Sequence, residues 1–141
     1  MTAEIFMRRA IALSLEQAQS GAGGPFGAVI VKDGRIIAEG ANRVTTTCDP
    51  TAHAEIVAIR NACAALHDFS LAGCEIYTSC EPCPMCLAAI YWARIGFDDA
   101  FLYDEIPRAL DQRTIPTGQV LAEEAIAAFT AWEEKPDKVR Y

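Results

Sequence analysis

The amino-acid sequence predicts a single α/β domain with a mixed β-sheet. Three observations support this prediction: a helix-spaced apolar pattern at the N-terminus, a β-hairpin signal directly after it, and a later succession of helix, strand and helix patterns. The chain has 141 residues, of which 52% are hydrophobic, and a chain of this size can bury a core without disulfides. Residues 1–141 are therefore expected to form one domain.

The first elements follow from spacing and turn chemistry. Apolar side chains recur every three to four positions between residues 3 and 17, which indicates an amphipathic helix. The glycine-rich stretch 21–25 cannot continue that helix. Two β-rich runs, 26–32 and 35–40, are joined by Asp33-Gly34, a strong two-residue hairpin signal. The sheet is thus expected to begin with an antiparallel hairpin.

The second half predicts helices packed on the sheet. Asp49-Pro50 offers a helix cap followed by a proline at the first helical position, and apolar side chains then recur at helical spacing to residue 66. Residues 75–78 are typical of a short strand, and 83–94 of an apolar helix that begins after a proline. This helix–strand–helix succession predicts a parallel continuation of the sheet. A last helix is expected over 121–132.

Composition excludes several classes of function. The net charge of −7 disfavours binding to a nucleic acid, because a polyanion would be repelled. The longest uncharged apolar run, 86–93, is far shorter than the roughly 20 residues of a membrane-spanning helix. The N-terminal segment does not resemble a signal peptide, so the six cysteines are expected to be reduced thiols in the cytoplasm. These features favour a small neutral substrate.

Two motifs carry the chemistry. His53-Ala54-Glu55 and Pro82-Cys83-Pro84-Met85-Cys86 match H-x-E…P-C-x-x-C, the pattern of zinc-dependent nucleobase deaminases. One imidazole and two thiolates, from His53, Cys83 and Cys86, can hold one zinc ion per chain and leave a fourth position for water. Glu55 is then expected to be the catalytic proton shuttle between that water and the leaving amine. The predicted reaction is hydrolytic removal of an amino group.

Other interpretations of these residues are weaker. A lone C-x-x-C is more often structural than catalytic, and only the combination of the two motifs reverses this expectation. Cys80 extends the pattern to C-x-x-C-x-x-C, but Ile90 stands where an iron–sulfur motif has its fourth cysteine. His67 has no partner at zinc-finger spacing. A non-catalytic zinc-binding interaction module remains an alternative, against which Glu55 argues, because a structural site needs no shuttle carboxylate.

With these motifs, the sequence resembles the cytidine/deoxycytidylate deaminase superfamily, and within it the short bacterial guanine deaminases. The matching stretches are residues 23–29, 49–55, 77–86 and 91–94, with 96–99 and the final tyrosine favouring the guanine branch. The resemblance implies a three-layer α-β-α fold of the cytidine deaminase type and hydrolysis of guanine to xanthine and ammonia in purine catabolism. Adenosine in tRNA and cytosine are the alternative substrates, because enzymes acting on them share every zinc residue.

The resemblance also implies further site residues. Asn42 would hydrogen-bond the edge of the base, and Phe26 and Trp92 would line the pocket. Asp99 would be a second proton-handling carboxylate, and Tyr141 would close the site. Similar enzymes are homodimers in which the C-terminal segment crosses to the partner, so Tyr141 is expected at either subunit's site.

One departure from the family concerns the middle of the sheet. Between Arg94 and Gly96, where the family has a further strand and its connection, this chain has only Ile95. Two explanations follow: the sequence omits a stretch of the natural chain, or the sheet is trimmed and is completed by residues 100–103 or by a partner. The zinc motifs precede this point, whereas the placement of Asp99 and Tyr141 depends on it.

Overall fold

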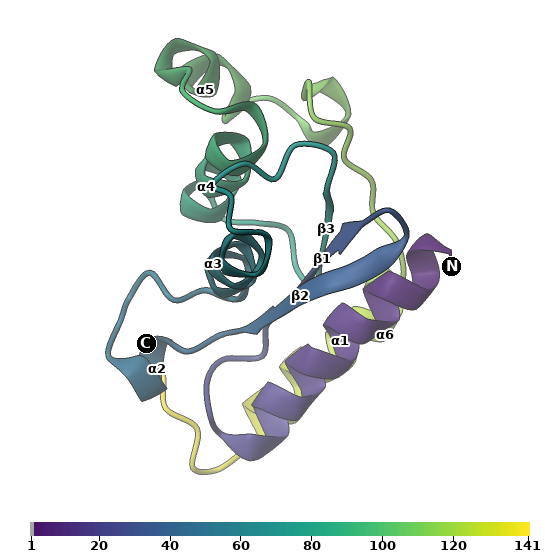
Figure 1. Ribbon diagram of the computed structural model, residues 1–141. Coiled ribbons are helices and arrows are strands. Elements are labelled where there is room, and N and C mark those ends of the chain that lie inside the picture. Colours follow the sequence, from purple (N-terminus) through teal and green to yellow (C-terminus); the bar gives the residue numbers. More distant parts are fainter. Residues whose placement is uncertain (1) are drawn as a thin grey trace.

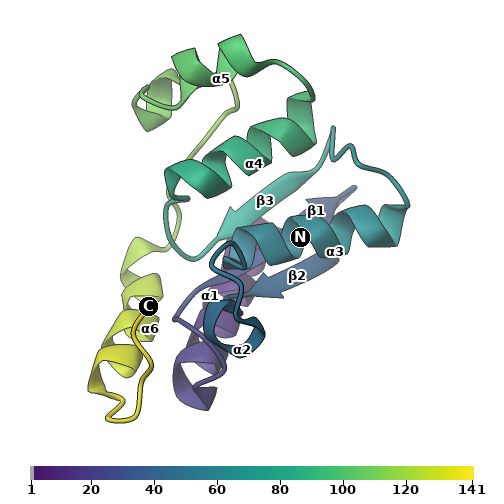
Figure 2. The same ribbon diagram turned by 90° about the vertical axis from the view of Figure 1, so that its left-hand side faces the viewer.

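The computed structural model describes residues 2–141, which form a three-layer arrangement of helices and a central sheet (Figures 1 and 2). The N-terminal and last helices pack together on one face of the sheet, and two further helices lie side by side on the other face. The elements are α1 (Ala3–Ser20), β1 (Gly27–Lys32), β2 (Arg35–Ala41), α2 (Val44–Thr47), α3 (Ala54–Leu66), β3 (Glu75–Thr78), α4 (Pro84–Ile95), α5 (Asp99–Glu105), the short 3₁₀ helix η1 (Leu110–Gln112) and α6 (Ala122–Glu134). Over residues 2–141, no helix is both long and apolar enough to cross a membrane.

The sheet confirms the hairpin but not the parallel continuation. Asp33 and Gly34 have φ angles of 50° and 72°, as a two-residue turn between twisted strands requires. The strand order is β2-β1-β3, and β1 pairs with both neighbours in antiparallel fashion. β2 and β3 run in the same direction but are separated by β1. The expected parallel pairing would need a neighbour on the other edge of β3, and the described chain has no strand there.

Two local expectations were wrong. Asp49-Pro50 does not begin a helix: the Asp49 carboxylate accepts from the backbone N–H of Thr51 at 2.9 Å and closes a turn, and α3 begins only at Ala54. Residues 100–103 do not complete the sheet, since they lie inside α5, whose start is capped by Asp98. α4 runs to Ile95 and α5 follows almost at once, so no room is left for a strand between them.

A close approach between β2 and α3 positions the start of α3. A Cβ atom at Gly40 would overlap the carbonyl oxygen of Ala54 and the backbone of Ala58. Ala54, Ala58 and Ala62 are at most 1% exposed and belong to the core on this face of the sheet. Small side chains on both elements therefore let the helix lie directly on the sheet, with His53 just before it.

A buried carboxylate clamps the C-terminal half. Glu105 is 0% exposed and accepts from the Tyr91 hydroxyl at 2.5 Å, from the Thr114 backbone N–H at 2.8 Å and from the Thr114 hydroxyl at 2.9 Å. Arg108 forms an ion pair with it at 3.0 Å. These donors, the Tyr91 hydroxyl first, hold the pKa of Glu105 below its usual value. The clamp fastens α5 and the start of the following segment onto α4.

We expect Gly40→Ala to lower the free energy of unfolding by about 1–3 kcal/mol, because the added methyl group overpacks the contact with α3. Gly118→Ala is the matched control: nothing lies within 4 Å of a Cβ at Gly118, so its effect should stay within about 0.5 kcal/mol. Urea denaturation of both variants measures the difference. Equal stabilities would show that β2 and α3 are not in such close contact.

Candidate metal centre and active site

The metal-ligating side chains stand at the N-terminal ends of two neighbouring helices. His53 is the N-cap residue of α3, and Cys83 is the N-cap residue of α4, which begins with Pro84. Cys86 follows in the first turn of α4. Because α3 and α4 lie side by side, their N-terminal ends bring the two motifs together. The partial positive charge of helix N-termini favours thiolates at this place.

The distances between the three ligand atoms fit a single zinc ion. The Nδ1 atom of His53 lies 3.7 Å from Cys83 Sγ and 3.5 Å from Cys86 Sγ, and all three ligand atoms lie within 4.8 Å of one another. In a tetrahedral zinc site, bond lengths of about 2.3 Å to sulfur and 2.05 Å to nitrogen place these atoms roughly 3.6 Å apart. The donor set is thus arranged for zinc, with Nδ1 as the imidazole ligand.

Burial makes this site depend on a cation. Cys86 is 0% exposed, and burial raises the pKa of its thiol, with the nearby Glu55 carboxylate adding to the effect. A buried thiolate without a positive charge beside it is unfavourable. A divalent metal provides that charge, and its binding is accompanied by release of the thiol proton.

Glu55 lies beside the ligands without joining them. It is in the first turn of α3, is 8% exposed, and its Oε2 atom lies 3.5 Å from Cys86 Sγ. Burial is the main cause that raises the pKa of this carboxyl. Among residues 2–141, the one group suited to hold a metal is His53, Cys83 and Cys86, so Glu55 and Cys80 stay outside it. The arrangement leaves a fourth position open next to a carboxylate.

Asn42 has a fixed side-chain orientation. It is 1% exposed, and its Oδ1 atom accepts from the backbone N–H groups of Gly24, at 3.3 Å, and Val44, at 3.2 Å. Two donors to one oxygen determine which way the amide points, so the Nδ2 group is left to donate elsewhere. An Asn42 held in this way can present a hydrogen-bond donor to a ligand.

The C-terminal residue lies at the same site. The Tyr141 hydroxyl contacts the backbone of Gly24, since a Cβ atom added there would overlap it. Burial of the phenol, together with the charge of Glu55, raises the pKa of Tyr141 to about 12. Phe26 follows Gly24 by two residues and packs edge-to-face on Phe129 of α6, with 5.6 Å between ring centroids. The 24–26 loop therefore joins Asn42, Tyr141 and Phe26 on one side of the site.

Residues 1–97 match the cytidine and deoxycytidylate deaminase zinc-binding region. The chain belongs to this deaminase family. The predicted zinc-dependent deaminase of the α/β class is thereby confirmed, and His53, Cys83 and Cys86 form the group in the described residues that could hold the family's zinc ion. The match ends at residue 97, two residues after α4, so it contains every ligand and Glu55.

Three proteins that are similar to this deaminase differ from one another in identity and coverage. Guanine deaminase of Bacillus subtilis is 52% identical over 156 aligned positions that cover all of both chains, and its X-ray structure superposes with a TM-score of 0.66 over 100% of this chain and 99% of that one. The structure of guanine deaminase from Nitrosomonas europaea is 25% identical, with a TM-score of 0.70 over 93% of this chain and 84% of that one. A tRNA-specific adenosine deaminase of Agrobacterium fabrum is 55% identical over 71 residues, 50% of this chain and 47% of its own.

This chain is shorter than its alignment with the guanine deaminase of Bacillus subtilis. The alignment extends over 156 positions, whereas the chain has 141 residues, a difference of 15. A typical strand has about 5–6 residues, so 15 positions are enough for one strand with its connection. This length agrees with the strand that the sequence lacks at Ile95.

Two residues expected at the site lie away from it in this chain. Trp92 is 41% exposed and packs on Phe97 with 5.6 Å between ring centroids, and Asp99 is exposed in the first turn of α5. Trp92 lies in the last turn of α4 and Asp99 beyond its C-terminal end, whereas Cys83 and Cys86 lie at its N-terminal end. A helix of 12 residues is about 18 Å long. Within one subunit, the shortened connection therefore leaves them at the opposite end of α4.

Gln17 positions Asn42, and the sequence motifs did not predict this role. Gln17 is 8% exposed, and its amide donates to the backbone carbonyl of Asn42 at 2.6 Å. It stands four residues after the buried Leu13, on the apolar face of α1. A polar residue at a core position of an amphipathic helix was the available signal, because such a group needs a buried partner.

We expect one zinc ion per chain in the purified deaminase and loss of most of it in Cys86→Ser, because the serine hydroxyl is a poor replacement for a thiolate ligand. Cys80→Ser is the matched control and should keep full zinc content, since Cys80 lies outside the ligand group. Inductively coupled plasma mass spectrometry of the dialysed proteins measures both. Zinc loss in the Cys80 variant would mean that the ligand set is different.

Proposed function

We propose that this deaminase hydrolyses guanine to xanthine and ammonia in the cytoplasm, as a step of purine catabolism. The observation that carries the proposal is the group of His53, Cys83 and Cys86 at zinc-ligand separations, with the buried Glu55 beside it. The choice of guanine is supported by the full-length identity of 52% with a guanine deaminase.

In the proposed reaction, Glu55 moves the protons. His53, Cys83 and Cys86 would hold a zinc ion, which would supply the nucleophile by lowering the pKa of a bound water to about 7. Glu55 accepts a proton from this water while the water oxygen bonds to the ring carbon that carries the amino group, and it then delivers that proton to the amino nitrogen, so that the C–N bond breaks and ammonia leaves. Burial raises the pKa of Glu55, and a carboxyl with a raised pKa is better able to hold the proton between the two steps.

Asn42, Phe26 and Tyr141 bind the base in this proposal. The free Nδ2 group of Asn42 donates to an acceptor on the base edge, while the Phe26 ring packs against the purine plane. Tyr141 closes the site from the 24–26 loop, in accordance with its contact on Gly24. All three surround a small planar ligand without any charged side chain among them.

We further propose a homodimer in which Trp92 and Asp99 serve the partner's site, whereas Tyr141 stays at the site of its own subunit, where it contacts Gly24. Trp92 and Asp99 are the reason to expect a second subunit. They lie at the end of α4 that is distant from the metal ligands of their own subunit. If Trp92 lines the pocket and Asp99 carries a proton, they do so at the metal centre of the partner subunit. The large exposed fractions of Phe97, 86%, and Trp92, 41%, are consistent with a surface that another subunit covers.

Adenosine in tRNA and cytosine are the competing substrates. The tRNA-specific relative matches only half of this chain, and a net charge of −7 opposes binding of a polyanion. Both observations favour a free base.

We expect ammonia release from guanine and little or none from cytosine, adenine, adenosine and guanosine. The reason is the identity of 52% with a guanine deaminase over the full length of the chain. A coupled ammonia assay over this panel, with zinc content measured in parallel, provides the test. Activity on another base alone would overturn the choice of guanine, and one bound zinc without deamination of any base would support a non-catalytic zinc module.

Glu55→Gln should retain zinc and lose about 10²–10⁴-fold in kcat, which is the usual contribution of a general acid–base. The amide preserves the shape of the side chain but cannot carry the proton. Glu123→Gln is the matched control, because Glu123 also lies in the first turn of a helix but is exposed on α6, and it should keep full activity. Steady-state kinetics with zinc analysis measures both variants. If Glu55→Gln lost zinc together with activity, Glu55 would be a ligand.

A further inference from the structure

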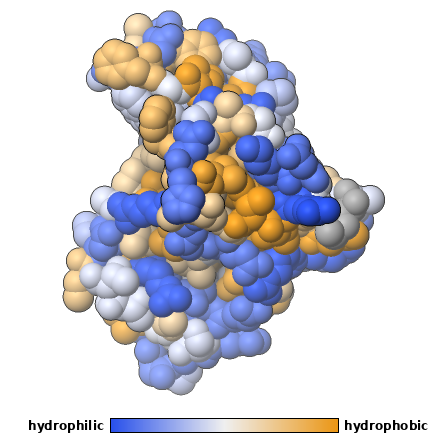
Figure 3. Space-filling model, in the orientation of Figure 1, coloured by the Kyte–Doolittle hydropathy of each residue, from blue (hydrophilic) through white to orange (hydrophobic). Residues whose placement is uncertain are grey.

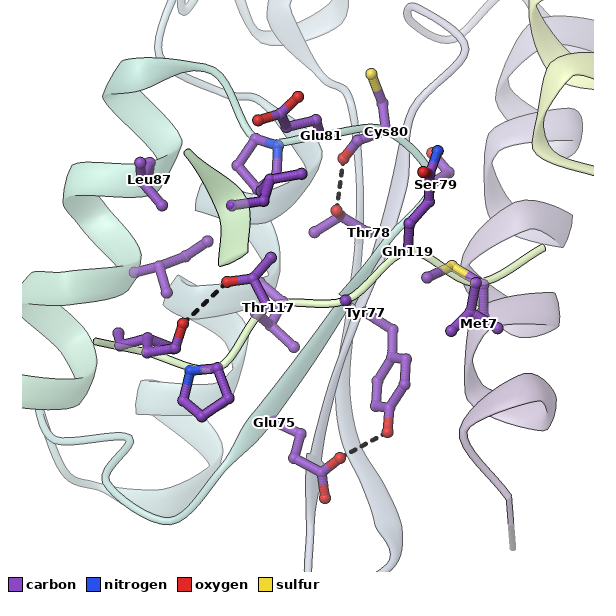
Figure 4. A pocket seen from close by; sticks show the side chains of 18 of the residues that line it. Met7, Glu75, Tyr77, Thr78, Ser79, Cys80, Glu81, Leu87, Thr117 and Gln119 are labelled. Carbon is purple, nitrogen blue, oxygen red and sulfur yellow. Dashed lines mark hydrogen bonds between the residues drawn. The ribbon is translucent and has the colours of Figure 1, made fainter. Parts of the chain in front are cut away.

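The chain contains an open slot beside β3. A cavity of about 590 Å³ lies between β3 and the segment 115–120, with side chains of α4 and α6 on its two sides. Figure 3 shows apolar side chains gathered in the hollow at the middle of this face, and Figure 4 shows the slot from close by. None of the three zinc ligands lines it. We call this cavity the β3 slot.

One wall of the β3 slot is an unpaired strand edge. The backbone N–H of Ser79 donates to Gly27 of the β1 side at 3.0 Å, and alternate residues of a strand direct their backbone groups to opposite edges. Ile76 and Thr78 therefore direct their N–H and C=O groups into the slot. Over residues 2–141, β1 is the only strand that pairs with β3. An unpaired edge of this kind is a template for another strand.

The segment 115–120 forms the opposite wall of the slot, and both of its ends are attached to parts of the fold away from β3. At residue 114, the segment is fixed by the Glu105 clamp, through bonds of 2.8 and 2.9 Å. At its other end it leads into α6, which packs along α1 on the far side of the sheet. These two attachments keep the segment 115–120 from closing onto β3.

Two nitrogens of a buried guanidinium that lines the slot have no hydrogen-bond partner among residues 2–141. The side chain of Arg113 is 9% exposed, and within the described residues its Nε and Nη1 atoms make no hydrogen bond. Glu81 Oε1 lies 3.9 Å from Nη1, which is within ion-pair range but too far for a hydrogen bond, and the Glu81 side chain is 58% exposed. Buried donors left unpaired are costly, and a guanidinium can only donate. Arg113 therefore fits an acceptor such as a carboxylate.

Charges at the two ends give the slot a direction. Arg113 lies at the C-terminal end of β3, beside Glu81, whereas Glu75 lies at the N-terminal end, where it accepts from the Tyr77 hydroxyl at 2.6 Å (Figure 4). Arg94, near Glu75, already donates to the Cys74 carbonyl at 3.1 Å. An extended peptide that places its C-terminal carboxylate on Arg113 and its N-terminal part near Glu75 would run parallel to β3.

We propose that the β3 slot binds one extended peptide strand, the C-terminal segment of a partner protein, parallel to β3 and with its terminal carboxylate on Arg113. The peptide's backbone pairs with Ile76 and Thr78, which is strand addition at a free sheet edge. Its alternate apolar side chains face α4 on one side and α6 on the other. This binding site is separate from the zinc centre and independent of the substrate.

The probe is an N-terminally fluorescein-labelled hexapeptide of alternating valine and threonine, made with either a free C-terminal carboxylate or an amide. We expect saturable binding of the carboxylate peptide to the zinc-loaded full chain in fluorescence anisotropy, and about 10-fold weaker binding of the amide, as loss of a charge-assisted hydrogen bond predicts. Arg113→Gln should weaken the carboxylate peptide by about 10-fold and abolish the difference between the two peptides. Arg140→Gln, at an exposed arginine, is the matched control and should change neither.

A second variant tests the strand edge. Ile76→Pro removes an N–H that faces the slot but leaves the bonds of Tyr77 and Ser79 to β1, so it should abolish binding of both peptides. Thermal unfolding confirms that each variant is folded, and the Arg113 variant decides the matter if the proline variant is not. Equal affinity of the two peptides, or no saturable binding, overturns the proposal. Sedimentation that shows a dimer broken by both substitutions would assign the slot to a second copy of the chain instead.

Discussion

The active site depends on the side-by-side packing of α3 and α4. Each helix begins at a residue that can bind the metal, His53 for α3 and Cys83 for α4, so the separation of the two N-terminal ends sets the separation of the ligands. Alanines on α3 and a glycine on β2 let α3 rest directly on the sheet. The 3.5–3.7 Å distances between Nδ1 and the sulfurs are therefore consequences of backbone packing. Small core residues that take no part in the chemistry thus help to set the positions of the metal-ligating side chains.

Much of this site could be predicted from the sequence because it is local. H-x-E and P-C-x-x-C each sit at one helix start, and Asp33-Gly34 determines the hairpin through its own backbone preferences. Asp49 misled the prediction of the helix start, because a capping aspartate caps a turn as well as a helix. The bond from Gln17 to Asn42 joins residues 25 apart in sequence, and no local pattern encodes it. Placement of Trp92 and Asp99 depends on a connection whose length differs from that of the relatives, so motif matching could not locate them.

The truncated sheet and the intact zinc centre are compatible because they use different parts of the fold. Every ligand precedes residue 87, and the family match is complete by residue 97. The strand that the relatives' length implies would lie on the far edge of β3, beyond the contacts of α3 with β1 and β2. Its loss therefore removes a neighbour of β3 without moving the helix ends that carry the ligands.

The buried charged side chains Glu105 and Arg113 differ in their hydrogen-bond partners, and the difference is related to the missing strand. Glu105 and Arg113 lie eight positions apart in sequence and are both withdrawn from solvent, yet Glu105 accepts from Tyr91, Thr114 and Arg108, whereas two nitrogens of Arg113 have no acceptor among residues 2–141. A folded chain rarely leaves a buried guanidinium unpaired, since the desolvation cost is not recovered. Arg113 lines the slot beside β3, where the described chain has no further strand. The same absence accounts for the free strand edge, the apolar hollow and the unused hydrogen-bonding capacity of Arg113, so an incoming main chain with an acceptor at its end would satisfy all three.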